Sequence, residues 1–371
     1  MNFRNSGIVV SWYFHLPTIC PSSEVQDLAH RSIDPLLRAH ERRGVPLTLA
    51  ISGTLLSRLA IDAPRTVEML SNMTSEGLCD GAVTLMHEAF PSLLSFRFLH
   101  KQISSDVAIK TQLLGVEPRT FFPPNFAWVG AIESCLAEHG IDQIILDADH
   151  YRLAVSPQSW RWSGGGVGAP ESVLLDPSID RRELWRVIEC EAKFNVDSNV
   201  LRCFFRDSSF VRKFSFGSTG LIQQVNTDSE IVEFAEGLNC AVDSGFVVTL
   251  ADDGDRVNPV SLRHYETFLD ILAEGSLVRC DQLLSSQRFP RLSYLPGYAL
   301  PNFESLLLEG MDSRHYMAIL AELCALDVGH NYDKEIMELQ DIFFLFWKTV
   351  SRKREYLQRA LEIVKSLSSS P

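Results

Sequence analysis

Continuous runs of apolar residues recur along the first two thirds of the chain, separated by stretches with helical periodicity. Apolar runs without alternation are typical of parallel strands that are covered on both faces. The runs predict strands at 7–14, 46–52, 81–86, 119–122, 143–147, 201–205 and 246–251. The stretches between them predict helices at 24–43, 98–114, 129–139 and 227–240.

The alternation of strands and helices indicates right-handed βαβ units, and hence a parallel sheet or barrel. Seven strands in this length favour an α/β fold of the kind of an incomplete TIM-like (β/α)7 barrel. After residue 275 the pattern changes, and 313–326 and 333–367 are almost wholly helical. We therefore predict a barrel domain at 1–275 and a C-terminal helical bundle at 276–371.

Charge and composition narrow the class of partner. The formal net charge is −13, which argues against nucleic acid and against an anionic membrane, because both require a basic face. No apolar stretch is long enough for a signal peptide or a membrane span. The eight cysteines are scattered without a C-x-x-C pair, so we expect reduced, mostly buried thiols in a cytoplasmic protein.

Polar residues directly follow the predicted strands, where barrels of this kind place their chemistry. They are His15, the segment Thr84–His87, Asn125, Asp147, Asp149, His150, Arg206, Asp207, Asp252, Asp253 and Asp255. Each of them alone is readily explained as an ordinary loop residue. Their presence at six strand ends together favours a site at the barrel mouth.

The aspartates of "TLADDGD" (249–255) form the sharpest group. Neighbouring carboxylates can raise the pKa of one of them, as a general acid requires. The structural alternative is an Asp-Asp-Gly turn in which Asp255 caps a helix beginning near Pro259. Because Asp252 and Asp253 lie closer to the strand end, we expect them to face a pocket.

Some of these residues are also possible metal ligands. His15, His87, Asp147, Asp149 and His150 supply oxygen and nitrogen ligands, but the spacing in "DADH" is not a compact metal motif. The glycine run at 164–166 follows no predicted strand and opens no helix, so it does not qualify as a phosphate loop. We therefore predict neither a metal nor a cofactor.

Several segments resemble glycoside hydrolase family 57, in the order in which that family has them. The segment "WYFHLP" is similar to the family's first motif, with His15 and Pro17 kept and Leu16 in place of glutamine. "GVEPRTFFPPNFAWVGAIESCLAEHGIDQIILDADHY" resembles the third motif and the strand after it, and "LADDGDRVNP" resembles the fourth. "LSYLPGYALPNFESL" is similar to a loop of the 4-α-glucanotransferase branch. The resemblance touches nearly the whole chain.

What the resemblance implies is an incomplete barrel with a helical bundle, acting on α-glucans with retention of configuration. The family's general acid/base aspartate falls on Asp253, and its nucleophile glutamate falls on Asn125. A retaining mechanism needs a carboxylate about 5–5.5 Å from the acid. An amide cannot form the glycosyl ester or supply the charge that stabilises an oxocarbenium ion.

Other positions depart from the family as well. Tyr13 stands where the family often has a second histidine, and Ala251 replaces a histidine common before the aspartates. The glutamate of the second motif has no clear counterpart, with Thr84 or Asp80 nearest. We therefore expect a divergent active site.

The candidate catalytic residues are Asp253, Asn125 and Asp252. The candidate substrate-binding residues are His15, Trp128, Asp147, His150, Phe122, Arg206 and Asp207, with Trp12 as a further aromatic of the sugar-stacking kind.

Three functions remain open. The first is a divergent glycosidase or transferase with Asp253 as general acid, which could be inverting with carboxyl groups roughly 6.5–9.5 Å apart. The second is a catalytically silent sugar-binding or regulatory protein, and the third is a barrel repurposed for another small-molecule reaction. The apolar run Phe343–Trp347 is expected to pack on the barrel or on a second copy of the chain in a homo-oligomer.

Overall fold

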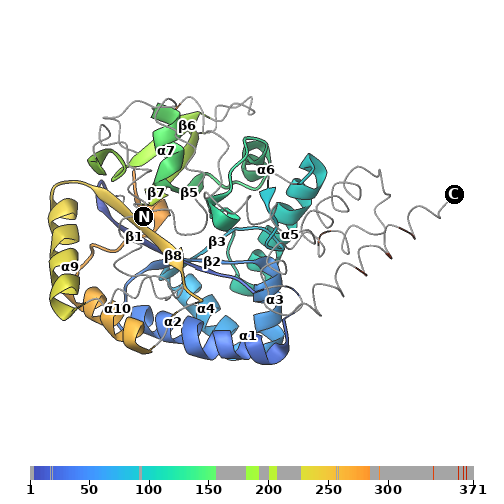
Figure 1. Ribbon diagram of the computed structural model, residues 1–371, viewed down its shortest axis with the longest axis horizontal. Coiled ribbons are helices and arrows are strands. Elements are labelled where there is room, and N and C mark those ends of the chain that lie inside the picture. Colours follow the sequence, from blue (N-terminus) through green and yellow to red (C-terminus); the bar gives the residue numbers. More distant parts are fainter. Residues whose placement is uncertain are drawn as a thin grey trace.

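The structure is a computed structural model (Figure 1). It describes residues 4–155, 181–191, 200–206 and 227–284 except 17, 19, 92, 93, 256 and 258, together with residues 292, 337, 358, 362 and 365. The predicted helical bundle at 276–371 therefore lies almost wholly outside the described residues, as does Phe343–Trp347.

Seven parallel strands of the described residues form the wall of a nearly closed barrel. They are β1 (Gly7–Phe14), β2 (Leu47–Ile51), β3 (Cys79–Ala82), β4 (Thr120–Phe121), β5 (Gln143–Asp147), β7 (Val200–Arg206) and β8 (Val247–Asp253), in the order β3-β2-β1-β8-β7-β5-β4. A parallel bridge between Val83 and Phe121 joins the two outer strands of that order. The predicted (β/α)7 barrel is thereby confirmed.

The closure of this barrel is uneven. β7 and β8 share one register pair, Arg206 with Thr249, whereas β1 and β8 are paired from Gly7 to Tyr13. The strand β6 (Val187–Glu191) runs antiparallel to β7 and was not predicted, because its short run mixes apolar residues with glutamates. The pairing in the barrel wall is therefore shortest between β7 and β8 and at the closing bridge between Val83 and Phe121.

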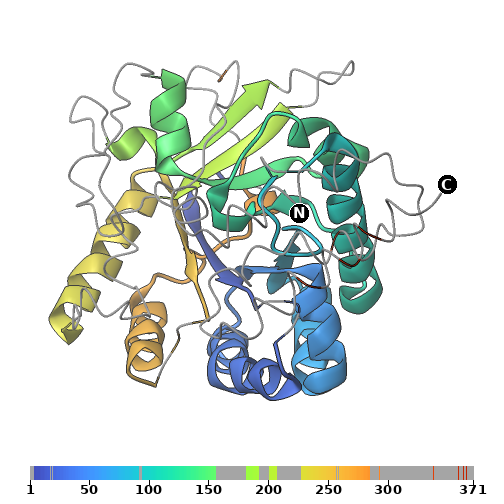
Figure 2. The ribbon, with the colours of Figure 1, turned by 45° about the vertical axis from the view of Figure 1, so that its right-hand side comes forward.

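Helices surround the outside of the sheet (Figures 1 and 2). They are α1 (Ser22–Leu28), the π-helix η1 (Ala29–Ile33), α2 (Asp34–Glu41), α3 (Gly53–Asp62), α4 (Pro64–Ser75), α5 (Phe96–Leu114), α6 (Ile132–Glu138), α7 (Ala148–Val155), α9 (Asp228–Asp243) and α10 (Pro259–Ile271). Short 3-10 turns lie at η3 (Pro124–Phe126), η6 (Arg181–Glu183) and η7 (Cys280–Gln282). Among the described residues, no helix is long and apolar enough to cross a membrane.

Local sequence explains where several helices start and stop. α9 begins at a capping box, in which the Thr227 hydroxyl accepts from the Glu230 amide and the Glu230 carboxylate accepts from the Thr227 amide. α5 ends at Gly115, whose φ of 76° is the left-handed conformation that glycine adopts without strain. The predicted helix at 24–43 is helical from Ser22 to Glu41, with the wide π turn ending two residues before Pro35, a residue that lacks the amide hydrogen for a helical bond.

Three apolar clusters lie among the described residues. One lies inside the barrel and includes Tyr13, Phe122 and Ala251. The other two lie between the wall and the helices. The first outer cluster includes Trp12 of β1 and the second includes Trp128 before α6. Because side chains alternate along a strand, each strand supplies one face to the interior and the other to an outer cluster.

Candidate active site at the barrel mouth

The two adjacent aspartates at the end of β8 lie on opposite faces of the sheet. In the register between β1 and β8, Tyr13 lies beside Asp253 and Trp12 beside Asp252. Tyr13 and Ala251 belong to the interior cluster, whereas Trp12 packs in the outer cluster. The alternation therefore puts Asp253 on the inner face. Asp252 accepts a hydrogen bond from the Asp253 amide at 2.8 Å.

The turn after Asp253 is fixed by a close approach of the chain to β1. The Gly254 amide donates to the Tyr13 carbonyl at 2.7 Å. A Cβ added at Gly254 would overlap the ring of Phe14. Only glycine fits here without displacing that buried ring, so the sequence "DDGD" positions Asp253 as well as supplying it.

Arg206 connects the ends of β5, β7 and β8. Its Nε donates to Asp147 Oδ2 at 2.6 Å, and its Nη1 donates to the Ala251 carbonyl at 3.2 Å. The guanidinium carbon lies 3.9 Å from the centroid of the Phe126 ring. The two charged side chains are 10% and 3% exposed. The structure thus brings two predicted substrate-binding residues, Arg206 and Asp147, together as a buried ion pair.

Asn125 lies in the middle of η3, between β4 and α6. Its side chain is outside what the structure describes. The next residue, Phe126, has a φ of 54°, which is uncommon for a residue with a side chain and costs energy. Phe126 is held by Arg206 and by Phe122, whose ring centroid is 4.9 Å away.

The aromatic residues near this turn are buried. Phe122 stacks on Tyr13 with a centroid separation of 5.4 Å and an interplanar angle of 2°. Phe122 and Trp128 are each 1% exposed, and Trp128 packs in the outer cluster beneath α6. Trp12 also faces outward, where its indole nitrogen donates to the Tyr265 hydroxyl at 3.1 Å. Of these rings, only Phe122 and Tyr13 face the barrel interior.

The predicted histidines lie near the same end of the barrel. His15 follows β1, is half-buried, and stacks on Tyr13 at 5.2 Å. His150 is fully buried in α7, with Nδ1 at 3.2 Å from the Asp147 carbonyl. Asp207 lies outside the described residues, and nothing is described of the Asp149 side chain.

The sequence provided no clear glutamate after the third strand, and the structure explains why. Asp80 lies near the start of β3 and accepts a hydrogen bond from the Thr120 hydroxyl at 2.6 Å. It is therefore at the opposite end of the barrel from the C-terminal strand ends that form the mouth. The Thr84 hydroxyl donates to the Leu85 carbonyl at 3.2 Å. The carboxylate at the mouth is instead Glu88, which is 1% exposed and accepts a hydrogen bond from the Tyr13 hydroxyl.

Glu88 was overlooked because the third strand was predicted at 81–86, whereas it ends at Ala82. The chain then continues through the bridge at Val83 to Glu88, which meets Tyr13 of the interior cluster. A signal was available in "LMHEAF", where a histidine and a glutamate stand among apolar residues. Paired polar residues in an apolar loop indicate burial with hydrogen-bond partners.

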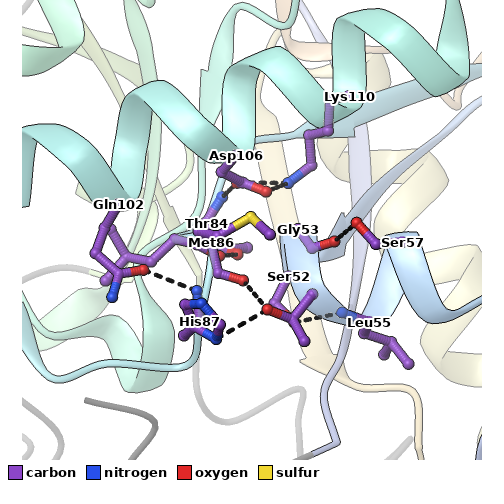
Figure 3. A network of polar contacts seen from close by, with 12 residues as sticks. Ser52, Gly53, Leu55, Ser57, Thr84, Met86, His87, Gln102, Asp106 and Lys110 are labelled. Carbon is purple, nitrogen blue, oxygen red and sulfur yellow. Dashed lines mark hydrogen bonds and ion pairs between the residues drawn. The ribbon is translucent and has the colours of Figure 1, made fainter. Parts of the chain in front are cut away.

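A polar network pins the segment that leads to Glu88 (Figure 3). The Thr84 amide donates to Asp106 Oδ2 at 2.7 Å, and Lys110 Nζ donates to the two oxygens of Asp106 at 2.6 and 2.5 Å. The His87 amide donates to Gln102 Oε1 at 2.8 Å. Gln102, Asp106 and Lys110 are at most 1% exposed, and their spacing of four residues puts them on one face of α5.

The start of α3 completes this network. The Thr54 hydroxyl donates to the Met86 carbonyl at 2.8 Å and lies 2.9 Å from Nδ1 of His87. The Thr18 hydroxyl also lies near Nδ1 of His87, at 3.1 Å. In the described part of the chain, no group of three or more histidine, cysteine, aspartate or glutamate side chains is placed to hold a metal ion.

Comparisons with known proteins identify a matching family and several structures with a similar fold. The family described as glycosyl hydrolase family 57 matches residues 25–283. The fold is similar to that of a 4-alpha-glucanotransferase from Thermococcus litoralis, with a TM-score of 0.66 and 14% identity over 92% of this chain and 55% of that one. This chain therefore spans little more than half the length of that enzyme. No curated protein matches the sequence.

Two further structures have a similar fold. A GH57 branching enzyme from Thermococcus kodakaraensis has a TM-score of 0.68 and 11% identity over 97% of this chain and 88% of that one. A GH57-type branching enzyme from Pyrococcus horikoshii has a TM-score of 0.66 and 12% identity, over 96% and 88%. At sequence identities of 11–14%, the similarity to these three structures shows a shared fold alone.

Proposed function

Because the chain belongs to glycosyl hydrolase family 57, we propose that it cleaves or transfers an α-glucan or a related saccharide at the barrel mouth, with Asp253 as the general acid/base. The observation that carries this proposal is the position of Asp253 at the inner face of the end of β8. In a barrel of this kind, that edge of the wall is where catalytic residues lie.

Asp253 has the chemistry that this role requires. Its carboxyl group would protonate the glycosidic oxygen while the bond to the anomeric carbon breaks, and would later deprotonate the attacking water or sugar hydroxyl. It is half-buried, so it can meet substrate. Asp252 accepts from its amide and fixes the backbone rather than reaching the interior.

The departure at Asn125 restricts the mechanism. An amide in the turn of η3 cannot form a glycosyl ester, so the family's usual covalent intermediate is not proposed at this residue. Arg206 and Asp147 form a buried pair under this turn and support its shape. The proposal therefore keeps the family's acid and assigns no nucleophile to residue 125.

The test is turnover of maltooligosaccharides and aryl α-glucosides by the wild type, Asp253→Asn and Asp252→Asn. General acid catalysis typically contributes 10²–10⁴-fold. We expect Asp253→Asn to lose about 100-fold or more, while Asp252→Asn, whose amide oxygen still accepts a hydrogen bond, stays within about tenfold of the wild type. Equal turnover by wild type and Asp253→Asn would refute the proposal.

A saccharide-binding protein without turnover is the second candidate, and Asn125 is the observation that favours it. It predicts that the wild type binds maltooligosaccharides in calorimetry but cleaves none of them. Absence of both heat and turnover would exclude this candidate together with the first.

A further inference from the structure

We propose that Glu88 is the nucleophile of this site and takes the place of the carboxylate that Asn125 lacks. This inference rests on the proposed function, since it assigns the second carboxylate to the reaction in which Asp253 is the acid. It is supported by the position of Glu88, by the charges around it, by the rigidity of the segment before it and by the contacts of the other carboxylates.

Position is given by Tyr13, which links the two carboxylates. Its backbone is the register neighbour of Asp253, and its hydroxyl donates to Oε2 of Glu88. Tyr13 belongs to the interior cluster of the barrel. Asp253 therefore reaches the mouth from β8 and Glu88 reaches it from the segment after β3. Tyr13 of β1 contacts both.

Two contacts of Glu88 favour its ionised form, and they act against its burial, which favours the neutral form. A hydrogen bond donated to a carboxylate stabilises the charged state, as does a nearby cation. Burial lowers the pKa of Lys110, and the negative charges of Asp106 and Glu88 oppose that shift. The same attraction acts on Glu88 from the side of α5. A nucleophilic carboxylate has to be ionised to attack.

The segment before Glu88 is unusually well fixed, as Figure 3 shows for Thr84, Met86 and His87. α5 holds Thr84 through Asp106 and His87 through Gln102, while α3 holds Met86. A nucleophile has to be held within a few tenths of an ångström of the reacting atom. This network supplies that rigidity.

Other carboxylates of the mouth are less well placed. Asp252 faces outward, and Asp147 is taken by Arg206 at 2.6 Å. Asp80 lies near the start of its strand. Asp147 shares the inner face of β5 with Ile145, but its carboxylate is bound by Arg206. Of the described carboxylates considered for this site, Glu88 and Asp253 therefore remain as the pair for the reaction.

The reaction balances with these two groups. An oxygen of Glu88 attacks the anomeric carbon, the glycosidic C–O bond breaks, and the proton of Asp253 passes to the leaving oxygen. Water then attacks the same carbon and gives a proton to Asp253, and the bond to Glu88 breaks. One water is consumed for each bond cleaved, and the configuration is retained. Tyr13 keeps its proton throughout.

The experiment compares Glu88→Ala, Glu88→Gln and Glu133→Gln on an activated aryl α-glucoside, with and without azide. Glu133 of α6 is a second buried glutamate, 5% exposed, and serves as the control. We expect both Glu88 variants to lose at least about 1,000-fold and Glu133→Gln to stay within tenfold. Azide should restore turnover of Glu88→Ala alone and yield a β-glycosyl azide, which a structural role would not produce.

A second measurement does not depend on the variants folding. The wild type is incubated with a 5-fluoro α-glucosyl fluoride, digested and mapped by mass spectrometry. A glycosyl adduct on Glu88 supports the inference. An adduct on another residue, turnover of Glu88→Ala within tenfold of the wild type, or a folded Glu88→Ala that azide does not rescue would each overturn it.

These outcomes separate the two proposals. If Asp253→Asn is inactive while Glu88→Ala keeps turnover, the proposed function stands and Glu88 is not the nucleophile. If the wild type cleaves no glycoside and takes no label, the proposed function fails and the assignment of Glu88 fails with it.

Discussion

The guanidinium of Arg206 binds the carboxylate of Asp147 at 2.6 Å, at the ends of β7 and β5. Both side chains are almost fully buried, and the same guanidinium also reaches the Ala251 carbonyl and the ring of Phe126. Removing one partner of such a pair leaves a charge without compensation, which typically costs 3–5 kcal/mol.

We expect Arg206→Met to lower the free energy of unfolding by about 3–5 kcal/mol in urea denaturation. Arg38→Met is the control, because its side chain is 63% exposed and its partner Asp34 lies 4.0 Å away. That variant should change stability by less than about 1 kcal/mol. A double-mutant cycle with Asp147→Asn should show coupling, and additive effects would contradict the described contact.

Gly53 is the subject of a second prediction. A Cβ at this residue would lie 2.6 Å from Met86 Sδ and 2.8 Å from Asp106 Oδ1. Gly53→Ala should therefore destabilise the protein by about 1–3 kcal/mol through overpacking. Gly237→Ala in α9 has open space around it, and should instead gain about 0.5–1 kcal/mol from helix propensity. Thermal unfolding of the pair checks the opposite signs.

Stability should depend on pH through His40. This imidazole is fully buried, with Nε2 at 2.7 Å from the Tyr265 hydroxyl. Burial lowers the pKa of His40 from 6.5 to about 4. The unfolded chain therefore binds this proton at higher pH than the folded one. The stabilisation is complete above about pH 6.5 and is lost as the pH falls to about 4, by roughly 3 kcal/mol.

Urea titrations between pH 4 and pH 7.5 measure this dependence. We expect His40→Gln to flatten the slope in that window, even though the variant is less stable at neutral pH. His30→Gln removes an exposed histidine and should leave the slope as in the wild type. A slope unaffected by His40→Gln would mean that other groups account for it.

Tyr13→Phe tests the hydrogen bond to Glu88. Loss of the donor should raise the pKa of the Glu88 carboxyl group, because a donated hydrogen bond favours the ionised form. If ionised Glu88 is required, the acidic limb of the kcat/KM profile moves to higher pH. An unchanged limb with reduced kcat would indicate a role in packing alone.

Asn125→Glu introduces, in the turn of η3, the glutamate that the family resemblance implies at this position. We expect the variant to fold, because Pro124 and Phe126 fix the backbone on both sides of the substituted residue. We do not expect higher turnover, since the resemblance implies departures at Leu16, Tyr13 and Ala251 as well. A gain above the wild type on aryl α-glucosides would contradict this expectation.

The parts of the fold that were predictable from sequence are those with an uninterrupted apolar run. β1 and β5 were predicted with the bounds that the structure has. β3 was predicted two residues late, because Cys79 and Asp80 belong to the strand although Asp80 is charged. Asp80 is tolerated inside the barrel since the Thr120 hydroxyl satisfies it.

Part of the site could also be inferred from the chain alone. The placement of Asp253 followed from the strand end and from the family resemblance, and alternation alone would have set it apart from Asp252. The link between Tyr13 and Glu88 spans two strands and depends on how the segment after β3 folds inward. Sequence spacing carries no information on such a contact. The four-residue spacing of Gln102, Asp106 and Lys110 puts them on one face of α5. The sequence does not show which segment that face contacts.

The two outer clusters give the barrel a divided architecture. One unites β1, β2, β3 and β8 with their helices, and the other unites the segment after β3 with β4, β5, β7 and theirs. Tyr13 and Glu88 stand on opposite sides of this division, as do Asp253 and Arg206. Neither half contains a complete mouth. The mouth is therefore complete only while both halves are folded together. In native-state hydrogen exchange, the amides of the mouth should open together with those of the seam between β7 and β8.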